Sequence, residues 1–484
     1  MEAVDTAARN QEVSLKNRSV TFPFSLLTIQ TINNIHFPPP LFPLPQFARF
    51  WQDYTHSNSA YRKSYLLFFF FLGFSYYVTA TELTPNFYQS LLDRGWRRSG
   101  NLLYKPDLRS CCPHYTIRLD SDQFHASKDQ RQVQNRFTKN ILGDTYIKEA
   151  ARLYPRSREQ AKKRNTDFDI VERVHECEKG QLKTPPVPAH DYNVTLESNE
   201  FTEEKYLLFE NYQRVVHHEP PHKITKHGFK SFLCASPLLR SKEMFDGLER
   251  LLGSYHQCYR IDGKLVAVGV LDLLPQCVSA VYFMYHESVH QHGLGKLGAL
   301  TEIALAKEQG YRWWYAGFYI HSCVKMRYKG DFSPQYILDP ESYTWDPLDS
   351  EVKRRLDEKK YLSLSRERAG KAEERTVETE EQFTAMGTSN SVFENSDGEA
   401  SLFDPDIPLF ARSMPGILTK AQLQDDVDLD TMELLVRGTQ AEAHQLVSWS
   451  TSDINDSHSV KCILAELAAA VGPELIKEMR VEFG

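Results

Sequence analysis

One stretch of alternating apolar runs constrains the fold of this chain more than any other feature. In HQCYRIDGKLVAVGVLDLL, two apolar runs flank Asp262-Gly263, a dipeptide well suited to the positive φ angles of a two-residue hairpin turn. Pro275 ends the second run, and residues 278–285 (VSAVYFMY) form a third, rich in β-branched and aromatic residues. We therefore predict three consecutive antiparallel strands.

A glycine-bearing turn and a helix are predicted to follow these strands. In HESVHQHGLGKLGALTEIALAKEQG, Gly293, Gly295 and Gly298 are expected to precede a helix that ends near Gly310. Bare backbone N–H groups and the positive end of the helix dipole would make this turn an anion site. Glycines near a helix start are often only structural, so both interpretations stay open.

Further helices and one more strand complete the predicted architecture. Apolar spacing indicates helices over residues 85–93, 201–216 and 242–252, and a strand over residues 311–320 (YRWWYAGFYI). The predicted fold class is α+β with a mixed sheet. It is divided into an N-terminal domain at 81–143, a charged connector or insertion at 144–200, and a second domain at 201–348.

The flanking segments are harder to place. The apolar run 65–80 is shorter than the ~20 residues of a spanning helix and begins too far into the chain for a cleaved signal peptide. A buried or unrelated segment is favoured over a membrane anchor, and residues 1–80 are left unplaced. Residues 349–403 are predicted to be charged and largely disordered, and 404–484 to be an extension with a helix near 460–467.

Charge and cysteine content limit the possible partners. The formal net charge of −7 gives no global basic field, so a nucleic acid would have to be held by a local patch. Eight cysteines in 484 residues are too sparse for a disulfide scaffold, which favours a reducing cytosolic or nuclear location.

Two clusters of cations and aromatic side chains are candidate binding sites. The first lies within 94–118 and could neutralise phosphates and stack on bases, although a solvated basic face is the alternative. The second follows the strand 311–320 and would suit an acidic side chain, with an ordinary basic loop as the alternative. The first comprises Arg94, Trp96, Arg97, Arg98, Lys105, Arg109 and Arg118, and the second Tyr315, Tyr319, His321, Lys325, Arg327, Tyr328 and Lys329.

Several long motifs resemble the arginyl-tRNA–protein transferases in their fungal form. They are LLDRGWRRSG, YKP, CCPHYTIR, YRIDGKLVAVGVLDLLP, VYFMY and WWYAGFYIHSCVKMRYKGDFSPQYIL, over roughly 82–140 and 200–348. The resemblance implies a Gcn5-related acyltransferase core with a smaller N-terminal domain. It also implies that arginine is transferred from arginyl-tRNA to N-terminal Asp, Glu or oxidised Cys, which marks proteins for ubiquitin-dependent degradation.

The chemistry of that reaction suggests roles for the second cluster. An aminoacyl ester is already activated, so the enzyme must position a neutral amine, accept its proton and stabilise an oxyanion. We expect His321 and Tyr319 to handle the proton, and Tyr315, Lys325, Arg327, Tyr328 and Lys329 to bind the acceptor. Arg94, Trp96, Arg97, Arg98, Lys105, Gly293 and Gly295 would bind aminoacyl-tRNA, and Asp272, Glu287 or Glu302 would hold the arginine.

Two alternative functions remain open on the sequence. The glycine turn would also suit a Gcn5-related enzyme that uses acetyl-CoA, and both clusters would suit a non-catalytic protein that binds tRNA or acidic peptides. No DNA or membrane partner is expected, and transfer itself requires no cofactor.

The adjacent cysteines Cys111 and Cys112 differ from the family pattern. The resemblance implies a zinc or iron–sulfur site in which a CGYC-like motif joins this pair, but the chain contains no CxxC. Only half of that site is present, and from the residues alone two buried thiols are favoured. Either this form has lost the metal site, or residues 1–78, which do not follow the family pattern, come from a misjoined reading frame. The second is favoured because the family-like pattern resumes abruptly at YVTATELTPNFYQSLLDRGW.

Overall fold

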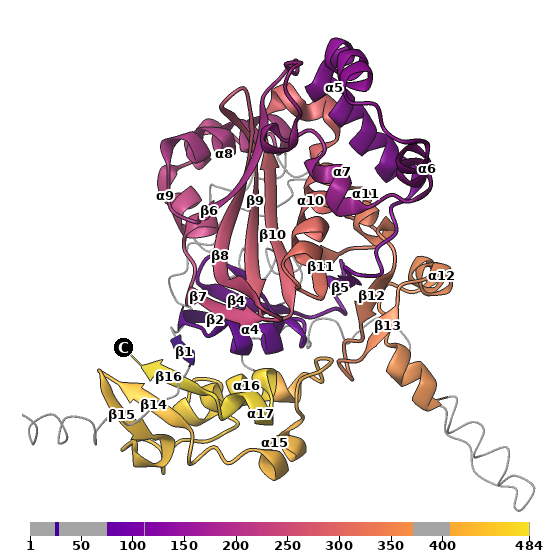
Figure 1. Cartoon of the computed structure of the whole chain (residues 1–484). Helices are drawn as coiled ribbons and strands as arrows, with labels where there is room; N and C mark the ends of the chain where they lie inside the picture. The colour runs from indigo at the N-terminus through magenta and orange to yellow at the C-terminus, as the bar shows by residue number, and fades with distance from the viewer. Residues whose placement is uncertain (1–24, 29–74, 111, 371–406, 484) are drawn as a thin grey trace, which may run out of the picture.

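Two sheets organise the computed structural model, which describes residues 25–28, 75–110, 112–370 and 407–483 (Figure 1). Within these residues the larger sheet has nine strands and the smaller has seven. The larger runs β13 (Trp345–Pro347), β12 (Gln335–Leu338), β5 (Tyr115–Asp120), β11 (Trp313–Tyr319), β10 (Cys277–Tyr285), β9 (Lys264–Leu274), β8 (Leu248–Ile261), β6 (Tyr192–Ser198), with β7 (Ser241–Phe245) beside β8. The smaller runs β15 (Thr439–Glu442), β14 (Glu433–Val436), β16 (Met479–Phe483), β1 (Ser25–Thr28), β2 (Ser75–Glu82), β4 (Leu102–Pro106), β3 (Arg97–Ser99).

The three predicted antiparallel strands are confirmed as β8, β9 and β10. Asp262 and Gly263 have φ angles of 50° and 77°, as a two-residue hairpin of this type requires. The helix predicted over 242–252 is wrong, because β7 and β8 form a second hairpin there. Its turn is Asp246-Gly247, with φ angles of 48° and 79°, so the same dipeptide makes the same turn twice.

Helix α10 (Leu294–Glu308) connects β10 to β11, and the two strands are parallel. Gly295 and Gly298 lie inside this helix and not before it as predicted, while Gly293 is its N-cap. A Cβ on Gly298 would stand 2.2 Å from Phe283 Cε2, so this glycine lets α10 pack closely on β10. The strand expected at 311–320 is confirmed as β11.

Helices cover both faces of the larger sheet (Figure 1). On one face α8 (Glu203–Val216) and α9 (Lys226–Phe229) pack on Val268 and Val270 of β9. On the other, α10 and α7 (Ile170–His175) pack on Leu271 and Leu273. Alternate residues of β9 therefore serve opposite cores, as the two-residue period of a strand requires. The α+β fold class is confirmed, whereas the likeness to Gcn5-related enzymes stays a prediction.

The segments predicted as separate domains interleave in space. Strand β5, from the segment 81–143, lies between β11 and β12 of the larger sheet. The expected connector 144–200 completes α5 (Lys128–Leu153) and contributes α6 (Arg158–Thr166), α7 and β6, and β6 pairs with β8. Apolar residues such as Ile170 and Val174 anchor this segment in the core. It is thus part of the fold.

The C-terminal extension packs against the N-terminal elements (Figure 1, yellow). Its predicted helix is confirmed as α16 (Val460–Val471), which shares a core with α4 (Pro85–Leu92) and Trp96. The other α-helices described there are α15 (Lys420–Asp426) and α17 (Pro473–Ile476).

The flanking segments are described only in part. Residues 75–80, the end of the apolar run, belong to β2, which pairs with β4. Residues 65–74 and 371–403 lie outside the described residues. None of the described helices combines the length and apolar character needed to cross a bilayer. Within 349–370, α12 (Ser350–Glu358) is a helix, as the charged pattern allows, but it packs Val352 and Leu356 into the core and is not fully solvated.

Candidate active site

The parallel strands β10 and β11 separate at their carboxyl ends. They pair only over Cys277–Ser279 and Trp313–Tyr315, although β10 continues to Tyr285 and β11 to Tyr319. Both strands are irregular where they part, and Gly317 has a φ of 75° at that point. Residues at the carboxyl ends of parallel strands meet at one edge, a common place for a site in such sheets. The candidate site lies at this edge, beside the start of α10.

A chain of hydrogen bonds joins three side chains at the end of β11. The hydroxyl of Tyr319 lies 2.6 Å from His321 Nδ1, and His321 Nε2 lies 2.8 Å from Asp357 Oδ1. An ionised carboxylate can only accept, so Nε2 of a neutral His321 donates to Asp357 and Nδ1 accepts from Tyr319. The structure brings the two predicted proton-handling residues together. It adds Asp357, from α12, which the sequence interpretation missed.

Arg327 completes this group from α11 (Val324–Arg327). Its Nη2 atom donates to Asp357 Oδ1 at 3.1 Å and lies 3.4 Å from His321 Nε2. Hydrogen bonding from His321, with Arg327 nearby, lowers the pKa of Asp357 from its ordinary value. Burial raises the pKa of Tyr319 to about 12, so at neutral pH its hydroxyl carries a proton that it can donate.

A second group of polar side chains lies toward α10. Tyr328 places its hydroxyl 3.6 Å from where a Cβ on Gly295 would stand, over the first turn of the helix. Lys329 is half-buried and donates to Phe318 O at 3.3 Å. Burial lowers its pKa to about 8, against the opposing effect of the Glu302 carboxyl. A neutral and a charged form of this lysine are therefore both accessible near neutral pH.

The other predicted acceptor residues do not converge with these. Lys325 is exposed on α11. Tyr315 is fully buried on the opposite face of β11, where its hydroxyl donates to Asp93 and its ring packs on Trp345 at 5.7 Å. Tyr315 and Tyr319 serve different cores, so the structure does not place Tyr315 in an acceptor pocket.

Two residues predicted to contact tRNA are structural. Trp96 is fully buried and donates to Ala470 O at 3.3 Å, so its ring is not exposed for stacking on a base. Arg98 is bound bidentately by Asp272, with N–O distances of 2.6 and 2.8 Å, and Ser254 also donates to this carboxylate. The sequence shows that cations and aromatics cluster here, but not that the cluster faces inward.

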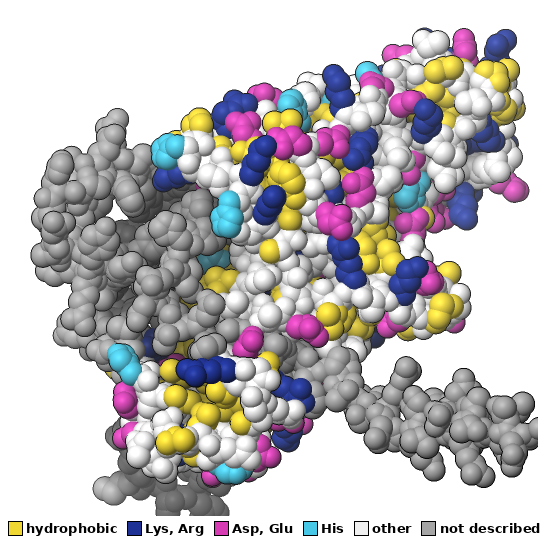
Figure 2. All heavy atoms as spheres, turned by 90° about the vertical axis from the view of Figure 1, so that its left-hand side faces the viewer, with side chains coloured by type: hydrophobic (Ala, Val, Ile, Leu, Met, Phe, Trp, Pro, Cys, Tyr) yellow, Lys and Arg dark blue, Asp and Glu magenta, His cyan; other side chains and the backbone are white. Residues whose placement is uncertain are grey.

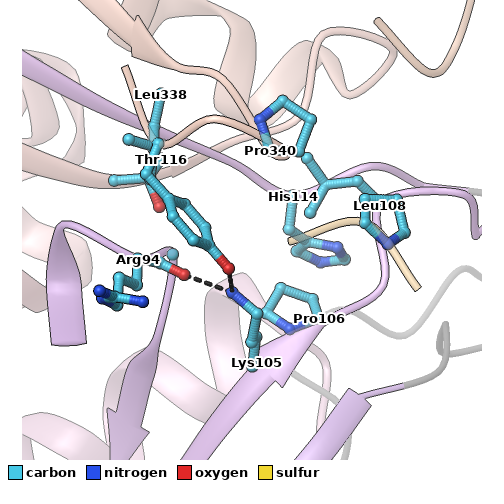
Figure 3. Close-up of a pocket in the computed structure, with 11 residues that line it drawn as sticks. Arg94, Lys105, Pro106, Leu108, His114, Thr116, Leu338 and Pro340 are labelled. Atoms are coloured by element: carbon cyan, nitrogen blue, oxygen red, sulfur yellow. Dashed lines mark hydrogen bonds between the residues drawn. The ribbon is translucent and has the colours of Figure 1, made fainter. Parts of the chain in front are cut away.

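Lys105 and Arg94 line a small hollow between the two sheets and the C-terminal extension (Figure 3). The Lys105 ammonium donates to Arg94 O at 2.5 Å and to Tyr343 OH at 3.0 Å. Burial lowers its pKa to about 7. Lys105 thus makes internal contacts, while Arg94 is half-buried. Where residues are described on the face in Figure 2, basic and acidic side chains are interspersed and form no continuous basic surface.

Arg97 has fewer hydrogen-bond partners than its neighbours Trp96, Arg98 and Lys105 would suggest. It is 6% exposed, and Nη1 donates to Trp96 O at 2.9 Å, whereas Nε and Nη2 have no partner within the described residues. Burial lowers its pKa. Its guanidinium lies 5.2 Å from the Phe318 ring centroid, directly beside the bulge in β11.

The structure separates the three carboxylates considered for the bound arginine. Asp272 is occupied by Arg98 and Ser254. Glu287 is exposed and accepts from Asn211 at 3.0 Å. Glu302 is 3% exposed and accepts from Trp314 Nε1 at 2.9 Å through one oxygen, and burial raises its pKa to about 7. Of the three carboxylates, Glu302 lies beside the point where β10 and β11 separate. Its carboxyl acts on Lys329, which lies at that point.

The predicted metal half-site is described only in part. Cys111 lies outside the described residues, and Cys112 is half-buried. Across the described chain no group of three or more His, Cys, Asp or Glu side chains is arranged to hold a metal ion. These residues do not supply the four ligands that zinc or an iron–sulfur cluster needs, so the metal site stays a prediction.

Comparisons with known proteins match this architecture. Residues 204–339 match the family description "Arginine-tRNA-protein transferase, C terminus", and residues 54–132 match "Arginine-tRNA-protein transferase, N terminus". The first includes the separating strands with Tyr319, His321 and Lys329, and the second includes Arg97. The second also starts at residue 54, within the segment 1–80 that was expected to fall outside the family pattern.

Three curated relatives illustrate the range of similarity. Arginyl-tRNA–protein transferase 1 of Drosophila melanogaster is 29% identical over 61% of this chain and 82% of its own length. Its namesake from Saccharomyces cerevisiae is 31% identical over 54% of this chain and 50% of its own length. The aspartate/glutamate leucyltransferase of Helicobacter hepaticus is 26% identical over 54% of this chain and 83% of its own length.

Proposed function

Because the chain belongs to the arginyl-tRNA–protein transferase family, we propose that it transfers arginine from arginyl-tRNA to the N-terminal amine of proteins that begin with Asp or Glu. The observation that carries this proposal is the hydrogen-bonded series Tyr319–His321–Asp357 at the carboxyl end of β11. It provides a proton acceptor where two parallel strands part.

The reaction needs no covalent intermediate on the enzyme. The acceptor amine attacks the ester carbonyl, a C–N bond forms, and the ester C–O bond to the tRNA 3′-terminal ribose breaks. The amine must lose one proton and the departing ribose oxygen must gain one. Peptide α-amines have pKa values near ~8, so modest assistance by a base is sufficient at neutral pH.

Tyr319 and His321 can carry out this exchange as a relay. The Tyr319 oxygen accepts the amine proton as its own proton moves to His321 Nδ1, and the imidazolium is stabilised by Asp357. The reverse movement delivers a proton to the departing ribose oxygen. Tyr319 is buried and its ring packs on Gly330, so this exchange requires that the amine gain access to the hydroxyl.

The proposal also specifies the acceptor, a protein whose first residue is acidic. The cations Arg97, Arg327 and Lys329 lie close to the end of β11, where they can meet a carboxylate. One relative is named an aspartate/glutamate leucyltransferase. Its name supports the proposal that the two proteins bind similar acceptors and differ in the amino acid that they transfer. Degradation of the arginylated protein and a cytosolic or nuclear location follow from the resemblance and belong to the same proposal.

A single transfer assay tests the proposal against its alternatives. The full chain is supplied with labelled arginyl-tRNA or labelled acetyl-CoA and with peptides that begin with Asp, Glu or Leu. We expect label from arginyl-tRNA on the Asp and Glu peptides. Acetyl transfer would support a Gcn5-related acetyltransferase instead, and peptide or tRNA binding without turnover would support a non-catalytic binding protein.

A further inference from the structure

The separation of β10 and β11 leaves two unpaired cations near one point. Lys329 Nζ lies 3.6 Å from where a Cβ on Gly317 would stand, beside Ala280 O of the neighbouring strand. It donates to the carbonyl of Phe318, and Arg97 lies over the ring of the same residue. Arg97 comes from β3 of the smaller sheet and Lys329 from the segment after α11, so three parts of the chain converge on the bulge.

Neither cation forms an ion pair within the described part of the chain, although the Glu302 carboxyl lies near Lys329. Arg97 has one bond, to a backbone carbonyl, and leaves Nε and Nη2 without partners. Lys329 has one side-chain bond, also to a backbone carbonyl. Leaving the donors of the buried Arg97 without partners is unfavourable, and a bound anion would supply those partners.

We propose that Arg97 and Lys329 together bind the side-chain carboxylate of the acceptor's first residue. This inference rests on the proposed arginyl transfer and gives its acceptor specificity a site. Neighbouring residues of a strand point to opposite faces of a sheet, so the side chains of Phe318 and Tyr319 would normally lie on opposite faces of β11. Pairing of β10 with β11 ends at Ser279 and Tyr315, and we place the carboxylate at this break, with the acceptor amine toward the Tyr319 hydroxyl.

The surroundings favour a small carboxylate over a tRNA phosphate. Arg97 is enclosed by the rings of Phe318 and Tyr315, and Tyr104 packs on Phe318 at 6.0 Å between ring centroids. A phosphodiester carries a ribose on each side and needs an open groove, whereas an Asp or Glu side chain ends in its charge. A guanidinium whose Nε and Nη2 atoms both lack partners also matches a carboxylate geometrically.

The test compares two peptides that differ only in Asp or Asn at the first position. In the wild-type full chain, kcat/KM for arginine transfer should favour Asp, because a neutral amide does not neutralise the charges of Arg97 and Lys329. Arg97→Gln should reduce the Asp-over-Asn ratio by about 10- to 100-fold, with KM for arginyl-tRNA unchanged. Arg97→Lys, which keeps the charge, should retain part of the preference.

Controls separate a binding defect from misfolding. Arg312→Gln removes an arginine that is 65% exposed at the other end of β11, and it should leave the ratio unchanged. Thermal unfolding midpoints of all variants establish that they are folded. An unchanged ratio in folded Arg97→Gln would overturn the proposal, as would a higher KM for arginyl-tRNA with an unchanged ratio, since the latter indicates a phosphate site.

Direct binding distinguishes failure of this inference from failure of the proposed function. Titration of each peptide into the full chain without tRNA should show tighter binding of the Asp peptide, and Arg97→Gln should abolish the difference. That result supports the carboxylate site even if arginyl transfer is not detected. Equal binding of both peptides by the wild-type chain, together with equal kcat/KM, would contradict it.

Discussion

His321 Nε2 lies 2.8 Å from Asp357 Oδ1, although 36 positions separate these residues in the chain. The contact joins the last turn of α12 to the residue after Ile320, just beyond the end of β11. It orients the imidazole so that Nδ1 faces the buried Tyr319 hydroxyl. Asp357 is therefore a positioning residue for the proposed relay.

Asp357→Asn should lower kcat for arginine transfer by about 10- to 100-fold, because a neutral amide stabilises an imidazolium less well. KM for arginyl-tRNA should stay unchanged. The matched control is Glu358→Gln, the next residue of α12, which is 58% exposed and, among the described residues, pairs with Arg354 alone. Equal turnover of the two variants would remove Asp357 from the mechanism.

Arg98→Met should destabilise the fold by about 3–5 kcal/mol, because it leaves Asp272 buried and without its cation. The free energy of unfolding in urea measures this. Arg98→Met combined with Asp272→Leu should recover much of the loss, since no unpaired charge remains. If Arg98→Met instead weakened tRNA binding at full stability, the structural role assigned to this pair would be incorrect.

Glu302→Gln should stabilise the protein at alkaline pH. Burial raises the pKa of Glu302 from 4.5 to about 7, so the unfolded chain loses this proton first. Stability then falls as pH rises from about 4.5 to 7, and it is lowest above 7. Relative to wild type, Glu302→Gln should gain about 1–3 kcal/mol between pH 5 and pH 8 in urea unfolding. A difference independent of pH would show that the carboxyl does not ionise in this range.

The Asp-over-Asn preference should decline as pH rises through about 8. Lys329 is charged below its pKa of about 8, and only the charged form attracts a carboxylate. The groups that act on it are Glu302 of α10, which raises this pKa, Arg97 of β3, which lowers it, and Cys323. In Lys329→Arg the cation persists to higher pH, so the preference should stay level to about pH 9. If the preference declined over the same pH range in wild type and in Lys329→Arg, a group other than Lys329 would be responsible.

Local patterns predicted much of the fold. Alternation around Asp262-Gly263 identified β8, β9 and β10, and apolar spacing identified α4, α8 and α16. The interpretation of 242–252 as a helix was wrong because Leu248, Leu251 and Leu252 have helical spacing, while Asp246-Gly247 gave the stronger turn signal. The pairing of β5 with β11 depends on long-range contacts that no local pattern encodes.

Only some residues of the candidate site could be predicted from the sequence. His321 and Tyr319 could be found because they follow a core strand, and the structure places them together. Asp357 could not, since it lies in a charged segment expected to be solvated and largely disordered, where one carboxylate resembles the others. Trp96, Arg97 and Arg98 looked like an exposed cluster because sequence composition does not reveal which face is covered. Their burial follows from packing between β3, β4 and α16.

The most direct test of the account is single-turnover arginine transfer by His321→Gln. Preformed arginyl-tRNA and an Asp-initiated peptide are mixed with excess full-length enzyme, and labelled peptide is followed with time. We predict that the rate constant falls by about 10²- to 10⁴-fold while arginyl-tRNA binding, measured separately, is unchanged. A wild-type rate constant in folded His321→Gln would contradict the placement of arginyl transfer at this site.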